Sequence, residues 1–285
     1  MKHPIYPCLW FDGQASEVAD FYSTVFDEVR ILETSDIVIT LEIEGVKFMF
    51  LDGGPHYKVS PAVSYYVYCR DAEYQKRIYE RLTEGGQIKM SLDEYIWSKG
   101  YAWVQDRFGV NWQLDIAPLD SDQRIIPTLL FSNDKRDLVK SAIDFYTDIF
   151  PDSHIVFEAP YPETEPNVPE GTLLFARFSL MGYLFNATSS TLPHDFDFSV
   201  GNSVVVECRN QEEIDHYWDR LTDGGREDMC GWLQDRFGVS WQIIPRHLDR
   251  LLNHPETGRA AWEEMMKMRK IDIRTLQLAG TSDKY

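Results

Sequence analysis

The feature that most constrains this chain is a phrase that it contains twice. WVQDRFGVNWQ occupies 103–113 and WLQDRFGVSWQ occupies 232–242, and the two phrases differ at two positions. Related phrases precede each copy: DFYSTVF is matched by DFYTDIF, and YERLTEGG is matched by YWDRLTDGG. Repetition in the same order indicates two homologous units, at roughly 5–117 and 125–245, joined by the polar linker PLDSDQR.

We therefore predict a first domain over 1–119, a second domain over 124–248 and a C-terminal helical extension over 249–285. A length of 285 residues with 44% hydrophobic residues is enough for two domains with their own cores. After the second unit, Ala261, Met265, Met268 and Ile271 form an apolar stripe at helical spacing, which predicts a helix that packs on the body of the protein or at a subunit contact.

Composition and charge limit the possible partners. No apolar run approaches the roughly 20 residues that span a bilayer, and Asp12 and Gly13 come before an export signal could form, so we expect a cytoplasmic protein without membrane contact. A formal net charge of −18 without a basic stripe makes nucleic acid an unfavourable partner. The four cysteines lack the close spacing of zinc or redox motifs, and we expect buried thiols.

Within each unit the hydrophobic pattern alternates between the periods of a strand and of a helix. Residues 5–11 predict a strand, and 14–26 predict a helix with Val18, Phe21, Tyr22 and Val25 on one face. Three strands follow at 29–35, 37–45 and 46–52. The order then recurs as a strand at 62–69, a helix at 72–86, a stretch poor in strand signals, and strands at 101–106 and 110–116. Each unit is therefore predicted to contain two βαβββ modules.

The glycine pairs and the repeated DRFG turn have structural explanations. Asp71 is suited to an N-cap, and the EGG and DGG glycines follow a helix, where a left-handed C-cap needs glycine. A phosphate loop precedes a helix, so these glycines do not indicate one. In the DRFG turns we expect Asp106 and Asp235 to accept backbone hydrogen bonds, and Gly109 and Gly238 to take a positive φ.

Two long stretches carry a specific resemblance. PCLWFDGQASEVADFY, and NQEEIDHYWDRLTDGGREDMCGWLQDRFGVSWQIIP followed by RAAWEEMMKMRKIDIRTL, resemble the PhnB-like group of the vicinal oxygen chelate superfamily, relatives of glyoxalase and bleomycin-resistance proteins that often carry a demethylubiquinone methyltransferase label. The resemblance covers nearly the whole chain, twice over. It implies an α+β fold in which paired βαβββ modules form half-open barrels around a pocket, with four modules in one chain. We expect the two domains to pair within the chain, with a homodimer as a further possibility.

The resemblance also implies where a metal ion would bind. Metal-using members place ligands on the first and last strands of each module in a pair, commonly as His and Glu. Counted from the Phe-Tyr pair of the first helix, these positions fall in the two copies on Pro7, Asp52, Ser64 and Gln113, and on Pro127, Asn186, Ser203 and Gln242. Since imidazole, thiolate and carboxylate ligands are largely missing from this set, we expect no metal and no other cofactor.

Several residues remain as candidates for contact with a small molecule: Trp10, Ser64, Gln113, Ser203 and Gln242. Each glutamine is expected on the concave side of its terminal strand, where it could orient a polar ligand or bond to a neighbouring strand. His56 and His194 lie at matching places before the first strand of a module, and are candidate acid, base or ligand-orienting groups. The alternative is a loop histidine that bonds the backbone.

Two functions follow from these residues. The first is a metal-free binding module that holds a small organic molecule in a barrel pocket, as the resistance proteins do by sequestration. The second is a metal-assisted or acid/base enzyme of lyase, isomerase or dioxygenase type that acts on a small metabolite. A third possibility is that only one copy keeps a pocket, because the first copy carries the insertion IKMSLDEYIWSK. Methyltransferase activity is disfavoured, since no glycine-rich loop opens a helix.

Overall fold

The structure, a computed structural model, describes residues 3–281 and divides into two compact units. The larger unit runs from Tyr6 to Asn202, and the smaller unit contains the described residues up to Ile5 and those from Ser203 onward. Residues 1–2 and 282–285, at the two ends of the predicted domains, lie outside the described residues. These units cut across the sequence repeat, and the boundaries 1–119, 124–248 and 249–285 stay a prediction about the repeated segments.

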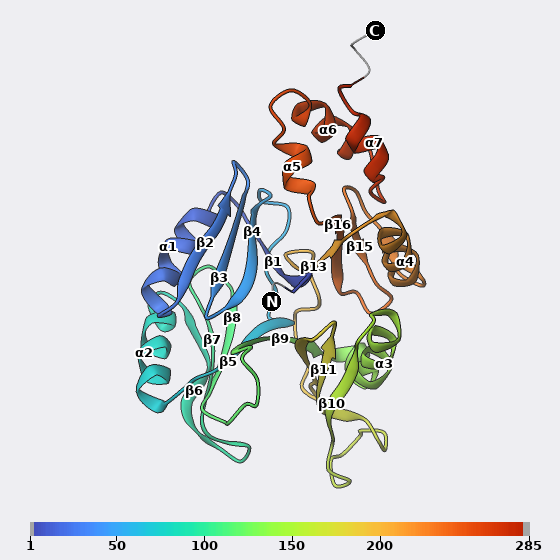
Figure 1. Cartoon of the computed structure of the whole chain (residues 1–285). Coiled ribbons are helices and arrows are strands. Elements are labelled where there is room, and N and C mark those ends of the chain that lie inside the picture. Colours follow the sequence, from blue (N-terminus) through green and yellow to red (C-terminus); the bar gives the residue numbers. More distant parts are fainter. Residues whose placement is uncertain (1–2, 282–285) are drawn as a thin grey trace. The chain divides into compact units, whose positions relative to one another are not determined.

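The predicted βαβββ order occurs four times along the chain (Figure 1). Module 1 contains β1 (Ile5–Phe11), α1 (Ala15–Val25), β2 (Val29–Thr34), β3 (Val38–Ile43) and β4 (Val46–Asp52). Module 2 contains β5 (Val63–Tyr68), α2 (Ala72–Thr83), β6 (Gln87–Tyr95), β7 (Ser98–Gln105) and β8 (Asn111–Asp115). Module 3 contains β9 (Ile125–Phe131), the short 3-10 helix η1 (Asn133–Leu138), α3 (Val139–Ile149), β10 (His154–Pro160), β11 (Leu173–Leu180) and β12 (Tyr183–Ser189).

Module 4 and the C-terminal helices follow. Module 4 contains β13 (Asn202–Cys208), α4 (Gln211–Thr222), β14 (Arg226–Glu227), β15 (Trp232–Gln234) and β16 (Ser240–Pro245). The extension contains α5 (Leu248–Leu252), α6 (Gly258–Met265) and α7 (Ile273–Leu278). The α+β fold class of four βαβββ modules is therefore confirmed. None of the helices in the described range 3–281 is long and apolar enough to cross a membrane.

One sheet of the larger unit joins the two sequence repeats. Its eight strands run in the order β10-β11-β12-β9-β5-β8-β7-β6. At the centre β5 of the first repeat pairs antiparallel with β9 of the second, so that Ser64 lies opposite Thr128. The two halves of the chain thus pair intramolecularly through main-chain hydrogen bonds. The other strands of the larger unit follow the order β1-β4-β3-β2, with β1 parallel to β4.

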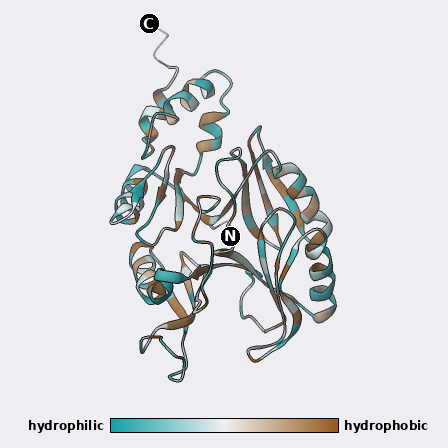
Figure 2. Ribbon diagram, turned by 180° about the vertical axis from the view of Figure 1, so that it is seen from behind, coloured by the Kyte–Doolittle hydropathy of each residue, from teal (hydrophilic) through white to brown (hydrophobic). Residues whose placement is uncertain are grey.

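The helices pack because their apolar residues recur at helical spacing. In α1 the predicted stripe of Val18, Phe21, Tyr22 and Val25 is buried. Asp71 caps α2 as predicted, since its Oδ1 accepts a hydrogen bond of 2.7 Å from Tyr74 N. Figure 2 shows hydrophobic residues gathered along the strands and alternating bands of polar and apolar residues on the helices.

The stretch predicted to be poor in strand signals contains β6 and the start of β7, and the prediction was wrong there, whereas the strand predicted at 101–106 matches most of β7. Strands β6 and β7 cover 87–95 and 98–105 and pair antiparallel. Register shifts interrupt their pairing in three places, and most of β6 is exposed. Bulges of this kind break the strict alternation that identifies a strand in a sequence. The matching strands of module 4 are only two and three residues long.

The DRFG turns have the predicted structure. Asp106 Oδ1 accepts hydrogen bonds from Phe108 N at 2.9 Å and from Val110 N at 3.0 Å, and Gly109 has φ of +88°. Asp106 Oδ2 accepts from Trp112 Nε1 at 3.0 Å. The second copy repeats this arrangement around Asp235. Each turn therefore connects the last two strands of a module through a buried, hydrogen-bonded aspartate.

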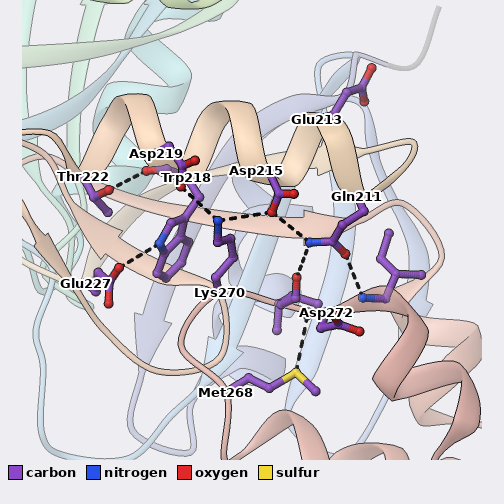
Figure 3. A network of polar contacts seen from close by, with 12 residues as sticks. Gln211, Glu213, Asp215, Trp218, Asp219, Thr222, Glu227, Met268, Lys270 and Asp272 are labelled. Carbon is purple, nitrogen blue, oxygen red and sulfur yellow. Dashed lines mark hydrogen bonds and ion pairs between the residues drawn. The ribbon is translucent and has the colours of Figure 1, made fainter.

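In the smaller unit, the sheet order is β14-β15-β16-β13, and the C-terminal segment is bound to helix α4. Figure 3 shows this network, in which Gln211 Nε2 donates to the Ile271 carbonyl at 2.9 Å and Lys270 Nζ lies 2.9 Å from Asp219. Ala261 and Ile271 are buried as predicted. The prediction of a single helix through the apolar stripe was wrong, because α6 ends at Met265 and α7 starts at Ile273. Main-chain bonds from Cys230 and Gly231 to residues 268 and 269 replace helical bonds there.

Candidate functional site

A row of four polar side chains crosses the centre of the eight-stranded sheet. Phe178 packs against Tyr146 of α3, so its neighbour Arg177 and the cross-strand partner Asn186 face away from α3. We call this the inner face. Register then places Thr128 beside Asn186, and Ser64 beside Thr128.

Gln113 of β8 completes this polar row of Asn186, Thr128, Ser64 and Gln113. Its Nε2 donates to Ser64 Oγ at 2.7 Å, and Asn186 Nδ2 donates to Thr128 Oγ1 at 3.2 Å. All four side chains are buried. The predicted pair Ser64 and Gln113 is therefore brought together, and its amide and hydroxyl groups are satisfied largely by one another.

Three tyrosines lie beside the polar row on the same face, and we call Tyr66, Tyr68 and Tyr101 the tyrosine cluster. Tyr101 OH donates to Gln113 Oε1 at 2.6 Å, and the Tyr66 hydroxyl donates to Asp115. The Tyr66 ring lies 4.9 Å from the Tyr68 ring and 6.1 Å from the Tyr101 ring. The three tyrosines are buried, Met90, Tyr95 and Trp103 pack against them, and their rings lie next to oriented amide and phenol groups.

Burial keeps these phenols protonated. Burial, followed by the nearby Asp115 carboxylate, raises the pKa of both Tyr66 and Tyr101. Burial also raises the pKa of Tyr68, against the opposing effect of the Arg177 guanidinium. Each hydroxyl therefore remains a hydrogen-bond donor at neutral pH. The cluster can orient a ligand, but its phenols are poor proton acceptors.

Pro127, predicted from the resemblance as the first metal-ligand position of the second copy, does not lie in the polar row. Pro127 lies opposite Tyr65, whose ring packs 5.5 Å from Trp112 on the other face of the sheet. Thr128 is the residue in the polar row. A shift of one residue turns a strand side chain to the opposite face. In module 1, Cys8 lies opposite Met49, as Thr128 lies opposite Asn186 in module 3. Cys8, and not Pro7, is therefore the residue equivalent to Thr128.

The polar row does not fit a divalent metal ion. Its groups are two amides and two hydroxyls, all neutral and paired with each other, whereas such ions favour several carboxylate, imidazole or thiolate ligands. Within residues 3–281, no group of three or more His, Cys, Asp and Glu side chains could hold a metal ion. Asp52, the other predicted position, instead accepts a hydrogen bond from Ala15 N at 2.9 Å and so holds the start of α1.

The second copy keeps the glutamine–serine pair but not its surroundings. Gln242 Nε2 donates to Ser203 Oγ at 2.9 Å, and both residues are buried. By the repeat, the positions of the tyrosine cluster and of Asp115 are occupied there by Val205, Glu207, Cys230 and Ile244. The two copies therefore share a framework, while the aromatic and acidic surroundings belong to the first copy.

The remaining predicted residues lie outside the polar row. Trp10 Nε1 donates to the Gly54 carbonyl at 2.7 Å, and its ring is half-buried. His56 is exposed in the segment between β4 and β5. His194 lies between β12 and β13 with Nε2 at 2.8 Å from Ser190 Oγ, and burial lowers the pKa of its imidazole.

The tyrosine cluster and Arg177 were not predicted from the sequence, whereas Asp115 shares the strand parity of Gln113. A signal existed for the tyrosines, because Tyr66 and Tyr68 share the strand parity of Ser64 in SYYVY. No signal existed for Arg177. It meets Asn186 only through the pairing of β11 with β12.

Comparison with known proteins identifies the fold of this chain and the family to which it belongs. Glyoxalase I from Zea mays shares the fold, with a TM-score of 0.58 at 12% identity over 88% of this chain and 95% of that chain. The PhnB protein from Bacillus cereus is 32% identical over 39% of this chain and 98% of its own, with a TM-score of 0.38. The fold is therefore glyoxalase-like.

The family model of the 3-demethylubiquinone-9 3-methyltransferases matches the chain twice, over residues 3–115 and 123–244. The chain belongs to this PhnB-like family. Protein YjdN from Escherichia coli is 30% identical over 78 residues, which is 27% of this chain. The chain spans about half the length, 53%, of this curated relative.

Proposed function

We propose that this protein binds a small organic molecule on the inner face of the eight-stranded sheet, without a metal ion. The observation that supports this proposal is the polar row, in which neutral, mutually bonded side chains lie at or next to the positions where the resemblance implies metal ligands. The buried tyrosine cluster places aromatic rings beside it, and the Tyr68 hydroxyl, which accepts from Arg177, keeps its own proton for a ligand. A largely apolar, aromatic site with a few fixed polar groups suits a small organic ligand.

We place the ligand site around Ser64 and Gln113 of the first copy, where Thr128 and Asn186 of the second copy lie beside them in the same sheet. Ser64 and Gln113 would orient the ligand there, since Gln113 is held on both sides, by Ser64 and by Tyr101. Ser203 and Gln242 would have a structural role, because the tyrosines and Asp115 have no counterparts around them. Trp10 remains a candidate contact on the first strand of the chain.

Methyltransferase activity is not part of the proposal, in spite of the family description. Gly85 and Gly224 each have φ of +74° and directly follow the C-caps of α2 and α4. Glycines that bind a dinucleotide or adenosyl cofactor precede a helix, where free N–H groups point at phosphate. We also keep the cytoplasm as the proposed location, since no disulfide joins the four cysteines, all within the described residues.

Two measurements test the proposal: elemental analysis of the purified protein, and ligand-observed NMR with a panel of small aromatic compounds. We expect no stoichiometric metal and binding by a subset of the panel. Gln113→Leu should weaken that binding at least about tenfold, because it leaves Tyr101 and Ser64 without their partner. The matched variant Gln242→Leu should not weaken it. Stoichiometric zinc, nickel, iron or manganese with a large thermal stabilisation would reject the metal-free site.

An acid/base enzyme is the second candidate, and one observation favours it. Burial lowers the pKa of His194, so its imidazole is neutral and able to take a proton near pH 7. In a binding module, His194→Gln and His56→Gln leave ligand affinity unchanged and no product forms. Turnover of a panel compound that is lost in either variant would establish the enzyme instead.

A further inference from the structure

We propose that Arg177 and Tyr68 form an anion subsite on the inner face, and that the bound molecule is a small aromatic carboxylate. This inference rests on the proposed function and specifies the ligand class. Arg177 lies on β11, next to the polar row, with its side chain half-buried.

The Arg177 guanidinium is held by neutral groups. Its Nε donates to Asn186 Oδ1 at 2.9 Å, and its Nη2 donates to the Tyr68 hydroxyl. Its other contacts are with aromatic rings, at 5.1 Å from the Tyr68 centroid and 5.9 Å from the Phe175 centroid. Among residues 3–281, no carboxylate lies within ion-pair distance of Arg177. A partly exposed guanidinium without a counter-ion is free to pair with the negative charge of a ligand.

The geometry leaves hydrogen-bond donors for that ligand. The guanidinium has five N–H donors, and these two bonds use only two of them. Tyr68 OH accepts from Arg177, so its own proton remains to be donated. A carboxylate can accept from both groups at once, in the bidentate manner that arginine favours.

The surroundings indicate an aromatic body for the ligand. Phe157 of the edge strand β10 lies opposite Arg177 in register, so it shares the inner face. Its side chain is 55% exposed, and its ring lies 6.3 Å from the half-buried Phe175 ring. A flat apolar ring next to the carboxylate would cover this surface and remove it from water.

The repeat supports a specific role, because module 1 lacks the subsite. In the matching strands of module 1, Thr40 lies opposite Met49, as Arg177 lies opposite Asn186. The position of Tyr68 is occupied in the second copy by Glu207, which would repel an anion. A purely structural arginine of this fold would be expected in both copies.

The test compares benzoate with benzamide, which has the same ring but no charge, by isothermal titration of the full chain. We expect benzoate to bind at least about tenfold more tightly than benzamide. Arg177→Gln should remove that preference by weakening benzoate binding about tenfold or more, while benzamide binding stays unchanged. Arg177→Lys should retain part of the preference, since it keeps the charge but loses the bidentate geometry.

Arg30→Gln is the matched control, because Arg30 is an exposed arginine paired with Glu42. It should leave both affinities unchanged. Circular dichroism and the melting temperature of each variant show whether it folds. Equal binding of the acid and the amide, or an unchanged benzoate affinity in Arg177→Gln, overturns the anion subsite and leaves the proposed function intact. If neither compound nor any other member of the panel binds, both proposals fall.

Discussion

Gly201 lies at a close contact between two backbone segments, which leaves no room for a side chain at this position. The segments that link β4 to β5 and β12 to β13 cross at this point, where Gly201 O accepts from Trp10 N at 3.0 Å. A Cβ on Gly201 would lie 2.1 Å from Lys58 O. Hydrogen bonds from Ser199 Oγ to Lys58 O at 2.7 Å and from Ser60 N to Asn202 Oδ1 at 2.6 Å hold the crossing closed. The two backbone segments therefore cannot easily move apart to accommodate a Cβ at Gly201.

We predict that Gly201→Ala lowers the free energy of unfolding by about 2 kcal/mol or more through overpacking against the backbone. The control is Gly171→Ala, where the Cβ meets nothing within 4 Å and only the φ of +81° is unfavourable. That variant should lose about 1 kcal/mol. Urea denaturation of both variants measures the difference. A Gly201→Ala protein as stable as Gly171→Ala would contradict the close crossing.

On the inner face, the direction of some side chains could be predicted from strand parity and that of others could not. The strand parity of Ser64 and Gln113 was predicted, and the structure places both on one face with a direct hydrogen bond. Thr128 was missed by one residue, and so was Cys8 in the first copy, because the distance from the first helix does not fix which face of the strand a residue takes. An error of one residue reverses the face, so counting along a strand needs a tertiary contact to anchor it.

At the scale of elements, the DRFG hairpin is the most constrained part of each repeat. The Asp106 carboxylate accepts four hydrogen bonds, two from the backbone of its own turn, one from Trp112 and one of 2.7 Å from Tyr22 OH of α1. Asp106 therefore connects the turn to the helix as well as to the last strand. The bonds to the turn backbone and to the tryptophan occur in both copies and account for the repeated phrase.

We predict that Asp106→Ala destabilises the protein by about 3 kcal/mol or more, because it leaves four buried donors without an acceptor. Asp20→Ala, at an exposed position of α1, should change stability by about 0.5 kcal/mol or less. Thermal or chemical denaturation of the two variants makes the comparison. A small effect of Asp106→Ala would show that the turn forms without its carboxylate.

Elements were predicted well where the pattern is regular and poorly where it is interrupted. The helix at 14–26 and the strands of module 1 were confirmed, since their apolar periods are strong. Strand β6 was missed because bulges and exposed residues remove that period, whereas most of β7 was predicted as the strand at 101–106. The apolar stripe from Ala261 to Ile271 correctly predicted buried residues, but it wrongly predicted one continuous helix. Burial there depends on main-chain bonds to Cys230 and Gly231, which a local pattern does not encode.

At the scale of the whole molecule, the sheet does not follow the sequence repeat. β5 of the first repeat and β9 of the second pair at the centre of one sheet. Neither repeat contains a complete version of this sheet. The interior strands of each repeat would present an unpaired edge if the repeats were separated.

We predict that the fragment 1–119 alone self-associates or aggregates, because its β5 edge lacks the partner β9. Co-expression with the fragment 120–285 should give a one-to-one complex, in which the amides of β5 regain the hydrogen-exchange protection that they have in the full chain. Light scattering and hydrogen exchange measure these two results. A stable, monomeric 1–119 fragment with a protected β5 would show that the repeat is an independent domain.

The sequence by itself determined the duplication, the four βαβββ modules and the roles of the DRFG turns, because these features depend on local periodicity, helix caps and glycine conformation. It also indicated that the expected ligand positions hold poor metal donors. Only the tertiary structure decided which modules share a sheet, and so which polar side chains meet. The polar row, the tyrosine cluster and the pairing of Arg177 with Asn186 depend on register between strands far apart in the chain, and register follows from long-range packing that no local pattern contains.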